Sequence, residues 1–325
     1  MKIREDMKAL LNAIDSAEVT RALHRTCAVV VLFHPEQDSL ARLLRMLTTM
    51  LGGVVLVDNT PGAIEMAPES GGDNGAVWLR NGRNVGLAAA QNRGIEWARG
   101  QGFGYILLLD QDSEPHAGMC VALAGASLDM EARGVIHAAV GPRYIDPRTG
   151  HSSFFVQIGP FGFRRIRCSG GTGVIPADFL ISSGSLIRVT VFERVGLMDE
   201  GLFIDHIDTD WYLRCRRCGL RAYGVCDAVM HHRLGDDQLR LWWGRYMYVP
   251  RYTPLRTYYM FRNSLLLYRR PHAPPRWIAA DIVRLGKVLF VRMLFGPDRL
   301  QHLKMLLRAL ADGLRGRTGQ VACAG

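Results

Sequence analysis

Residues 106–112 constrain the fold of this chain more than any other segment, because an unbroken apolar run ends there in two carboxylates. Such a run is typical of a strand buried on both faces of a parallel sheet. Strand side chains alternate, so Asp110 and Asp112 are expected to point the same way from its carboxyl end. Paired carboxylates favour a hard cation, Mg²⁺ or Mn²⁺, that shares its shell with substrate phosphates. Asp is also a common turn residue, which leaves a plain turn as the alternative.

Apolar runs that predict strands alternate with helical patterns in the first third of the chain. The predicted strands cover 28–33, 54–57 and 106–109, with a helix over 39–51 and a loop and helix over 84–99. This order predicts an α/β fold with a doubly wound, mostly parallel sheet flanked by helices. Such sheets bind ligands at the carboxyl ends of their strands, where His34, Pro35 and Asp58 also lie.

The second half of the chain has a more mixed pattern. We expect a strand over 179–181, a short helix near 189–195, a helix from about 208 that stops at Gly219, and a strand over 221–232. Residues 1–25 predict a helical extension, and helices resume after Pro275.

The formal charge of +10 is concentrated near the end of the sequence. Residues 269–325 hold eleven Lys and Arg against three Asp and Glu, so the rest of the chain is nearly neutral. This distribution argues against nucleic acid as a partner and for a local anionic surface such as a membrane. No stretch of eighteen uncharged apolar residues predicts a membrane-spanning helix.

Two basic amphipathic helices are predicted in this region. In residues 277–295, the side chains of Asp281, Arg284, Lys287 and Arg292 fall within an arc of about 140°. The second helix carries an apolar stripe formed by Leu300, Leu303, Leu307, Leu310 and Leu314. Such helices lie on an anionic membrane surface or pack on the domain, and the sequence leaves both open.

The seven cysteines are scattered, and the first 25 residues lack the apolar core of a secretory signal. We therefore expect reduced thiols in the cytosol. Cys215, Cys218 and Cys226 with His231 and His232 suggest a zinc site, but the first two fall in a helical pattern and no second matching pair follows, which disfavours zinc.

Three further groups of residues carry chemistry. Asp58 is placed to accept the imide N–H of a pyrimidine base, or to form a turn. Residues 84–94, with Asn84 and Asn92, alternate small side chains, so a phosphate or a neighbouring strand approaches this backbone closely. It is not the G-x-G-x-x-G of nicotinamide-binding folds.

The second acidic cluster contains Asp205 and Asp208 near the start of a predicted helix. The helix dipole keeps such a carboxylate ionised, which suits a general base, although plain N-capping is the alternative. His232, after the late strand, is a candidate metal or diphosphate ligand.

Together these motifs resemble glycosyltransferase family 2, which has the GT-A fold. The segments 109–113 (LDQDS), 179–184 (FLISSG), 202–210 (LFIDHIDTD) and 258–263 (YYMFRN) are similar to bacterial rhamnosyltransferases of the O-antigen and rhamnolipid type. The likeness covers about residues 26–317. It implies a GT-A domain over 26–268 and C-terminal basic amphipathic helices over 269–325.

The resemblance also implies roles for individual residues. It implies a dTDP-L-rhamnose donor with its base on Asp58, a metal on Asp112, and Asp110 toward the ribose or metal. Asp208 matches the family's catalytic base, with Asp205 as its rival. Ser182, Ser183 and Gly184 would lie near the donor sugar or the acceptor. The chain departs from the family at Ile207, where Glu is usual, and at His34, where Asn is frequent.

The implied reaction is an inverting displacement in which the base deprotonates an acceptor hydroxyl. The acceptor is expected to be an amphiphile, either a lipid-linked O-antigen intermediate or a mono-rhamnolipid, at the inner face of the cytoplasmic membrane. A processive polysaccharide synthase is disfavoured, because Gln238 and Trp242 miss the Gln-x-x-Arg-Trp spacing by one residue. An inactive lipid- or nucleic-acid-binding protein is the alternative of another class.

Overall fold

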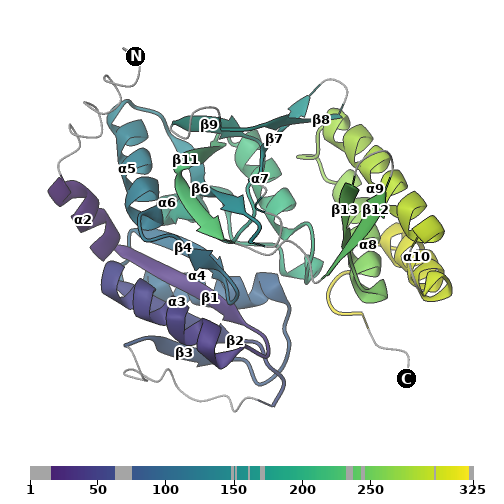
Figure 1. The fold of residues 1–325 in the computed structure, drawn as a ribbon, viewed down its shortest axis with the longest axis horizontal. Coiled ribbons are helices and arrows are strands. Elements are labelled where there is room, and N and C mark those ends of the chain that lie inside the picture. Colours follow the sequence, from purple (N-terminus) through teal and green to yellow (C-terminus); the bar gives the residue numbers. More distant parts are fainter. Residues whose placement is uncertain are drawn as a thin grey trace.

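The computed structural model describes residues 16–62, 75–147, 150, 152–159, 162–168, 173–231, 237–242, 246–295 and 298–321. Within these residues a nine-stranded sheet forms the centre of the molecule, in the order β3-β2-β1-β4-β10-β6-β11-β5 with β9 paired to β11. Helices cover the sheet, and the last helices gather at one side, at the right edge of Figure 1.

One half of the sheet is entirely parallel. It consists of β1 (Thr26–Leu32), β2 (Gly53–Asp58), β3 (Val77–Arg80) and β4 (Tyr105–Asp110). Almost every side chain of β1, β2 and β4 is buried, which explains their continuous apolar sequences. The predicted strands 28–33, 54–57 and 106–109 are confirmed.

The other half mixes directions, because β10 runs antiparallel between β4 and β6, whereas β11 runs parallel to β6. Its strands are β5 (Glu114–Pro115), β6 (His137–Ile145), β9 (Val174–Ala177), β10 (Leu186–Arg188) and β11 (Arg221–His231). Two hairpins lie outside the sheet: β7 (Phe155–Gly159) with β8 (Gly162–Ile166), and β12 (Asp237–Trp242) with β13 (Tyr246–Arg251).

Helices pack on both faces of the sheet, as the doubly wound prediction requires. One core joins the sheet to α2 (Ser16–His24), α3 (Gln37–Met50) and α5 (Met119–Ala132). The opposite core includes α4 (Leu87–Gly100), α6 (Val189–Val195), the 3₁₀ turn η1 (Glu200–Leu202) and α7 (Ile207–Arg217). The predicted α/β, doubly wound architecture is therefore confirmed.

Three helices complete the described chain: α8 (Pro254–Tyr268), α9 (Pro275–Phe295) and α10 (Arg299–Leu314). Thr253 caps α8 by accepting the N–H of Arg256, and Pro254 occupies its first turn. A third apolar core joins the three helices to Phe203. None of the helices in the described part of the chain combines the length and apolar character needed to cross a bilayer.

The predicted strand over 179–181 is wrong. Phe179 makes only an isolated bridge to Val156, and residues 180 and 181 lead into a turn closed by Ser185, whose N–H donates to Ser182 O (2.9 Å). The strand at this point of the sheet is instead β10, which begins at Leu186.

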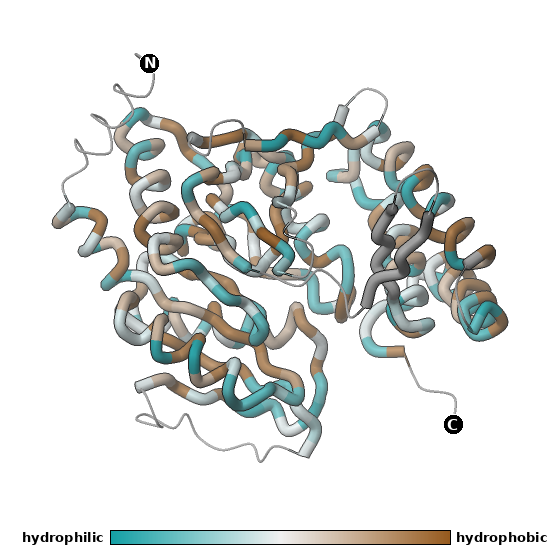
Figure 2. Tube along the Cα trace, viewed as in Figure 1, coloured by the Kyte–Doolittle hydropathy of each residue, from teal (hydrophilic) through white to brown (hydrophobic). Residues whose placement is uncertain are grey.

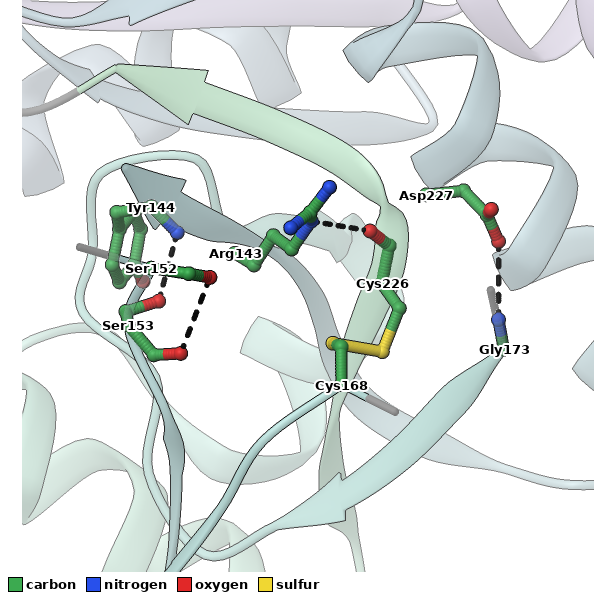
Figure 3. Close-up of a disulfide and its surroundings, with 8 residues drawn as sticks. All are labelled: Arg143, Tyr144, Ser152, Ser153, Cys168, Gly173, Cys226 and Asp227. Carbon is green, nitrogen blue, oxygen red and sulfur yellow. Dashed lines mark hydrogen bonds between the residues drawn. A yellow bond between two sulfur atoms is a disulfide. The ribbon is translucent and has the colours of Figure 1, made fainter. Parts of the chain in front are cut away.

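The expectation that all thiols are reduced is also wrong. Cys168 and Cys226 form a disulfide, which ties the segment after β8 to the middle of β11 (Figure 3). Arg143 from β6 donates through Nε to the carbonyl of Cys226 (2.8 Å). The zinc alternative fails for the same reason, because Cys226 is occupied by the disulfide and Cys215 is buried within α7.

Candidate active site

Polar residues gather where the parallel strands end. In the β1–β2 register Leu32 pairs with Asp58, and in the β1–β4 register Val31 pairs with Asp110. Asp58 and Asp110 therefore end the two strands on either side of β1. Asp58 is buried, and its Oδ1 accepts the backbone N–H of Thr60 (2.9 Å). Carboxylates thus stand at the edge of the sheet where the sequence predicts a ligand-binding crevice.

Gln111 joins the end of β4 to the end of β1. Its amide nitrogen donates to the carbonyl of Phe33 (3.0 Å), and its amide oxygen accepts the N–H of Phe33 (2.7 Å). The next residue, His34, has a positive φ of 48° and donates its N–H to Thr60 Oγ1 (2.9 Å). The middle residue of Asp-Gln-Asp therefore fixes the loop that carries His34 and Pro35.

The charge of Asp112 acts on its neighbour Asp110. Burial, and then the neighbouring charge of Asp112, raise the pKa of Asp110 to about 7, although Arg256 acts in the opposite direction. The Asp112 side chain is exposed. A carboxyl with a raised pKa beside another carboxylate is the electrostatic signature of a site that gains from a bound cation.

The residues Ser182 and Ser183 join this pair to the second acidic cluster. Ser182 Oγ donates to Asp208 Oδ1. Ser183 Oγ accepts the N–H of Asp110 (3.2 Å) and lies 2.6 Å from Ser113 Oγ. Two adjacent serines thus connect the end of β4 with the start of α7, so Asp110 and Asp208 face one site.

Asp208 lies in the first turn of α7, as predicted. Burial is the largest cause that raises its pKa, to about 6, with further contributions from Asp110 and Asp205, whereas hydrogen bonds from Ser182 lower it. A carboxylate with such a pKa is ionised at neutral pH and still basic enough to take a proton from a hydroxyl.

Asp205 occupies a strained loop next to Asp208. Asp205 and His206 both have a φ of 63°, in the left-handed region that non-glycine residues seldom adopt. Arg256 Nε donates to Asp205 Oδ1 (3.3 Å), whereas Oδ2 is buried with no hydrogen-bond partner among the described residues. Burial raises the pKa of Asp205, against the effect of Arg256.

The side chains of α8 hold this loop in place. Asn263 donates to the carbonyls of Leu202 (2.9 Å), Ile204 (2.8 Å) and Asp205 (2.9 Å). Arg262 donates to the carbonyl of Leu202 as well (3.0 Å). The motif at 258–263 is therefore a clamp on the backbone that presents Asp205 and Asp208.

Sequence reasoning missed Arg256. It lies on α8, and its charge acts on both Asp205 and Asp110. Its guanidinium is therefore close to both acidic clusters, where a cation can contact a diphosphate. No local pattern marks it, because its partners are remote in sequence.

Other predicted residues have roles that support the backbone. Both N–H groups of the Asn92 amide are used, by Met198 O (2.9 Å) and Glu200 Oε1 (2.8 Å), which leaves neither for a ligand. Asn84 Oδ1 accepts from Asn59 Nδ2 and from the N–H of Gly86, both at 3.0 Å. Gly184 has a φ of 83° and packs where a Cβ would meet Pro142 at 2.5 Å. His232 lies outside the described residues.

The donor set at the strand ends fits a hard divalent cation. In the described part of the chain no three His, Cys, Asp or Glu side chains converge on one point. Mg²⁺ is usually held by one or two carboxylates together with substrate phosphates and water, so Asp112 and Asp110 are sufficient protein ligands.

A cavity of about 390 Å³ opens beside the N-terminus of α7. Its lining includes five aromatic side chains and charged groups: Phe154, Phe163, Phe179, Tyr252, Trp277, Arg165, Asp205, Asp281 and Arg284. Thr209, which follows Asp208, lines it as well. A cavity with aromatic walls and a few charged groups next to a candidate base can hold a hydroxyl-bearing substrate.

Several known proteins are similar to this chain. Residues 28–196 match the profile described as glycosyl transferase family 2. The chain is 31% identical over 297 residues to dTDP-rhamnosyl transferase RfbF of Shigella flexneri, covering 90% of this chain and 96% of that protein. It is 27% identical over 220 residues to galactofuranosyltransferase GlfT1 of Mycobacterium tuberculosis, covering 65% and 71%.

Two solved structures share the fold at low sequence identity. The structure of GalNAc-T7 with UDP, GalNAc and Mn²⁺ has a TM-score of 0.50 at 14% identity, covering 84% of this chain and 58% of that chain. The S. aureus TarS 1–349 complex with UDP-GlcNAc has a TM-score of 0.50 at 12% identity, covering 90% and 81%. The GT-A expectation is thus confirmed, and the chain belongs to glycosyltransferase family 2.

Proposed function

We propose that this protein transfers L-rhamnose from dTDP-L-rhamnose to a hydroxyl group of an amphiphilic acceptor, with inversion at the anomeric carbon. The similarity to a dTDP-rhamnosyl transferase over 90% of the chain supports the donor. The observation that carries the proposal is the pair Ser182 and Ser183, which joins Asp208 to the end of β4.

The donor would bind across the ends of the parallel strands. Asp58, buried at the end of β2, would accept the N–H of the thymine base. His34 and Asn84 lie on the loops after β1 and β3 and would contact the nucleoside. Arg256 would lie against the diphosphate. A divalent cation on Asp112 and Asp110 would neutralise charge on the departing diphosphate.

Asp208 would act as the general base. It would take the proton of the acceptor hydroxyl as that oxygen attacks the anomeric carbon, in one in-line displacement. Ser182 would orient the carboxylate by its hydrogen bond. Asp205 is the rival base, but its hydrogen bond from Arg256 favours a role in positioning the Arg256 guanidinium.

The acceptor would enter through the aromatic cavity beside α7. Its hydroxyl would reach Asp208 past Thr209, while rings such as Phe179 would stack on the sugar. We propose a lipid-linked O-antigen or related surface-glycan intermediate, with mono-rhamnolipid as the alternative. Both are presented at the inner face of the cytoplasmic membrane.

The test uses the purified protein with dTDP-L-rhamnose, Mg²⁺, and a panel of lipid-linked sugars and rhamnolipids, and follows the release of dTDP. Turnover that depends on one acceptor class is the expected result. Turnover with UDP-sugars but not with dTDP-L-rhamnose would contradict the donor assignment. An inactive binding protein would tolerate Asp112→Asn and Asp208→Asn without any change in binding, whereas in an enzyme both replacements are expected to lower dTDP release by at least about 10²-fold.

A further inference from the structure

The outer sides of α9 and α10 expose large apolar side chains. We name this set the apolar face: Ile282, Val283, Phe290 and Leu294 of α9, with Leu300, Leu303, Leu307, Leu310 and Leu314 of α10. Their exposed fractions run from 36% to 75%. Brown, hydrophobic residues recur along both helices at the right edge of Figure 2. A soluble monomer seldom exposes so many neighbouring apolar residues, so this surface calls for an occupant.

The rotation of α9 is set by polar groups that point inward. Asp281 is 1% exposed and accepts from Ser264 (2.7 Å), Tyr268 (2.8 Å) and Arg284 (2.7 Å). Arg292 is buried and donates to Thr257. Two members of the charged arc predicted from the sequence, Asp281 and Arg292, thus point toward the body, whereas Lys287 is exposed, and the apolar face of α9 lies on the outside. The inner side of α9 is mixed, because Trp277, Ala280 and Leu285 are buried there as well.

The rotation of α10 is fixed in the same way. Asp312 is buried and accepts from Tyr258 (2.9 Å), and His302 lies 2.9 Å from Thr257 Oγ1. Gly313 packs so closely on α8 that a Cβ would meet Leu265 at 2.9 Å. The leucine stripe is therefore on the side of α10 that is remote from α8. The helix does not use these leucines to bind the domain.

The charge around the apolar face is positive. Arg276, Lys287, Arg299, Lys304, Arg315 and Arg317 are exposed. Of the acidic residues described in 275–321, Asp281 and Asp312 are buried, which leaves Asp298 as the exposed one. Apolar side chains bordered by cations complement a surface that offers acyl chains and anionic headgroups. A symmetric contact between two copies would instead bring these cations together.

We propose that the apolar face is a docking surface for an anionic phospholipid membrane. It rests on the proposed function only for its purpose, since an amphiphilic acceptor is presented at a membrane. The same α9 lines the aromatic cavity from within, through Trp277 and Arg284. Docking by its outer side therefore places the acceptor cavity next to the membrane from which the acceptor comes.

The test is flotation of the purified full chain with vesicles of phosphatidylcholine, either alone or with about 40% phosphatidylglycerol, a fraction that gives a strong negative surface charge. We expect binding to the anionic vesicles at least about tenfold stronger than to the neutral ones, weakened at high salt. The variant Phe290→Ser/Leu303→Ser/Leu307→Ser is expected to lose at least about tenfold in binding while keeping its circular dichroism and melting temperature. The variant Lys304→Glu/Arg315→Glu should lose the preference for anionic lipid.

The matched control replaces exposed apolar residues elsewhere, Val121→Ser/Ile136→Ser, and should bind as the parent does. Parent-like binding by the Phe290, Leu303 and Leu307 variant would overturn the proposal, as would no binding to either vesicle. A parent dimer that the variant converts to a monomer, without loss of vesicle binding, would assign the face to a second copy instead. Because no nucleotide sugar is used, the result is independent of whether the donor assignment holds.

Discussion

The hydrogen bond from Ser182 to Asp208 leads to a quantitative prediction for Ser182→Ala. The bond lowers the pKa of Asp208, but burial has the larger effect, so the pKa is raised to about 6 with the bond in place. A hydrogen bond to a charged group contributes about 1.5–3 kcal/mol, and one pKa unit corresponds to about 1.4 kcal/mol. Losing the hydroxyl should therefore raise the pKa of Asp208 by about 1–2 units. The backbone N–H of Ser182, which also lowers this pKa, is retained in the variant and moderates the change.

The base works when it is ionised, so the rate should fall as the pH falls through this pKa. The acid limb of kcat/KM, which reports the free enzyme, should move from near pH 6 to about pH 7–8. At pH 6 the ionised fraction, and with it kcat/KM, should drop about 5- to 50-fold, with activity close to the parent at about pH 9.

The assay is dTDP release measured across pH at low donor concentration. Ser127→Ala is the matched control, because Ser127 is also buried but bonds to Glu131 and His137 instead. A Ser182→Ala profile scaled down uniformly, with an unmoved midpoint, would refute the assignment of Asp208 as the titrating base.

Further predictions concern the carboxylates. Asp208→Asn should lower kcat by about 10²–10⁴ with little change in donor affinity measured by calorimetry. The folded-state pKa of Asp208, about 6, exceeds the ordinary value of 3.8, so its ionised carboxylate destabilises the fold above pH 6. The variant should therefore melt at a higher temperature than the parent at pH 8 but not at pH 4. Mg²⁺ should raise the melting temperature of the parent and not of Asp112→Asn, and EDTA should stop turnover. Asp210, buried against Arg270 (2.6 Å), Arg214 (2.8 Å) and His272 (2.8 Å), has its pKa lowered to about 2, so its contribution should be lost only as pH falls from about 4 toward 2. Asp210→Ala should cost about 3–5 kcal/mol in urea unfolding at pH 7. Dithiothreitol should expose two further thiols, from Cys168 and Cys226, to a thiol reagent under denaturing conditions.

The parallel half of the sheet could be predicted because burial on both faces leaves an unmistakable apolar run. The strand β6 was harder, since Gly141 and Pro142 interrupt its pattern. Both residues are explained by neighbours remote in sequence. Leu180 fills the space where a Gly141 side chain would be, and Gly184 has no side chain to collide with the ring of Pro142. Local propensity does not contain such contacts.

The candidate site also contains residues that local sequence reveals and residues that depend on contacts remote in sequence. Asp58, Asp110 and Asp208 were identified because each stands at the end of a strand or the start of a helix. The amide of Asn92 has the composition of a ligand but bonds to Met198 and Glu200, which lie over a hundred positions away. Arg256 is the opposite case: nothing in its local sequence marks it, and it lies near Asp110 and Asp205 only because α8 packs there.

The clamp of α8 on residues 201–205 has a consequence for building hybrid enzymes. Arg262 also donates to the carbonyl of Gly319 (2.6 Å), and Tyr259 Oη accepts the N–H of Val321 (3.0 Å), so the last described residues are fastened to the same helix that holds the loop of Asp205. Exchanging acceptor preference between relatives should therefore succeed when residues 199–206 and 254–321 travel as one unit. If residues 254–321 were exchanged alone, the Arg262 and Asn263 side chains of one relative would have to bond to the loop carbonyls of another, and the fit of these hydrogen bonds would be lost.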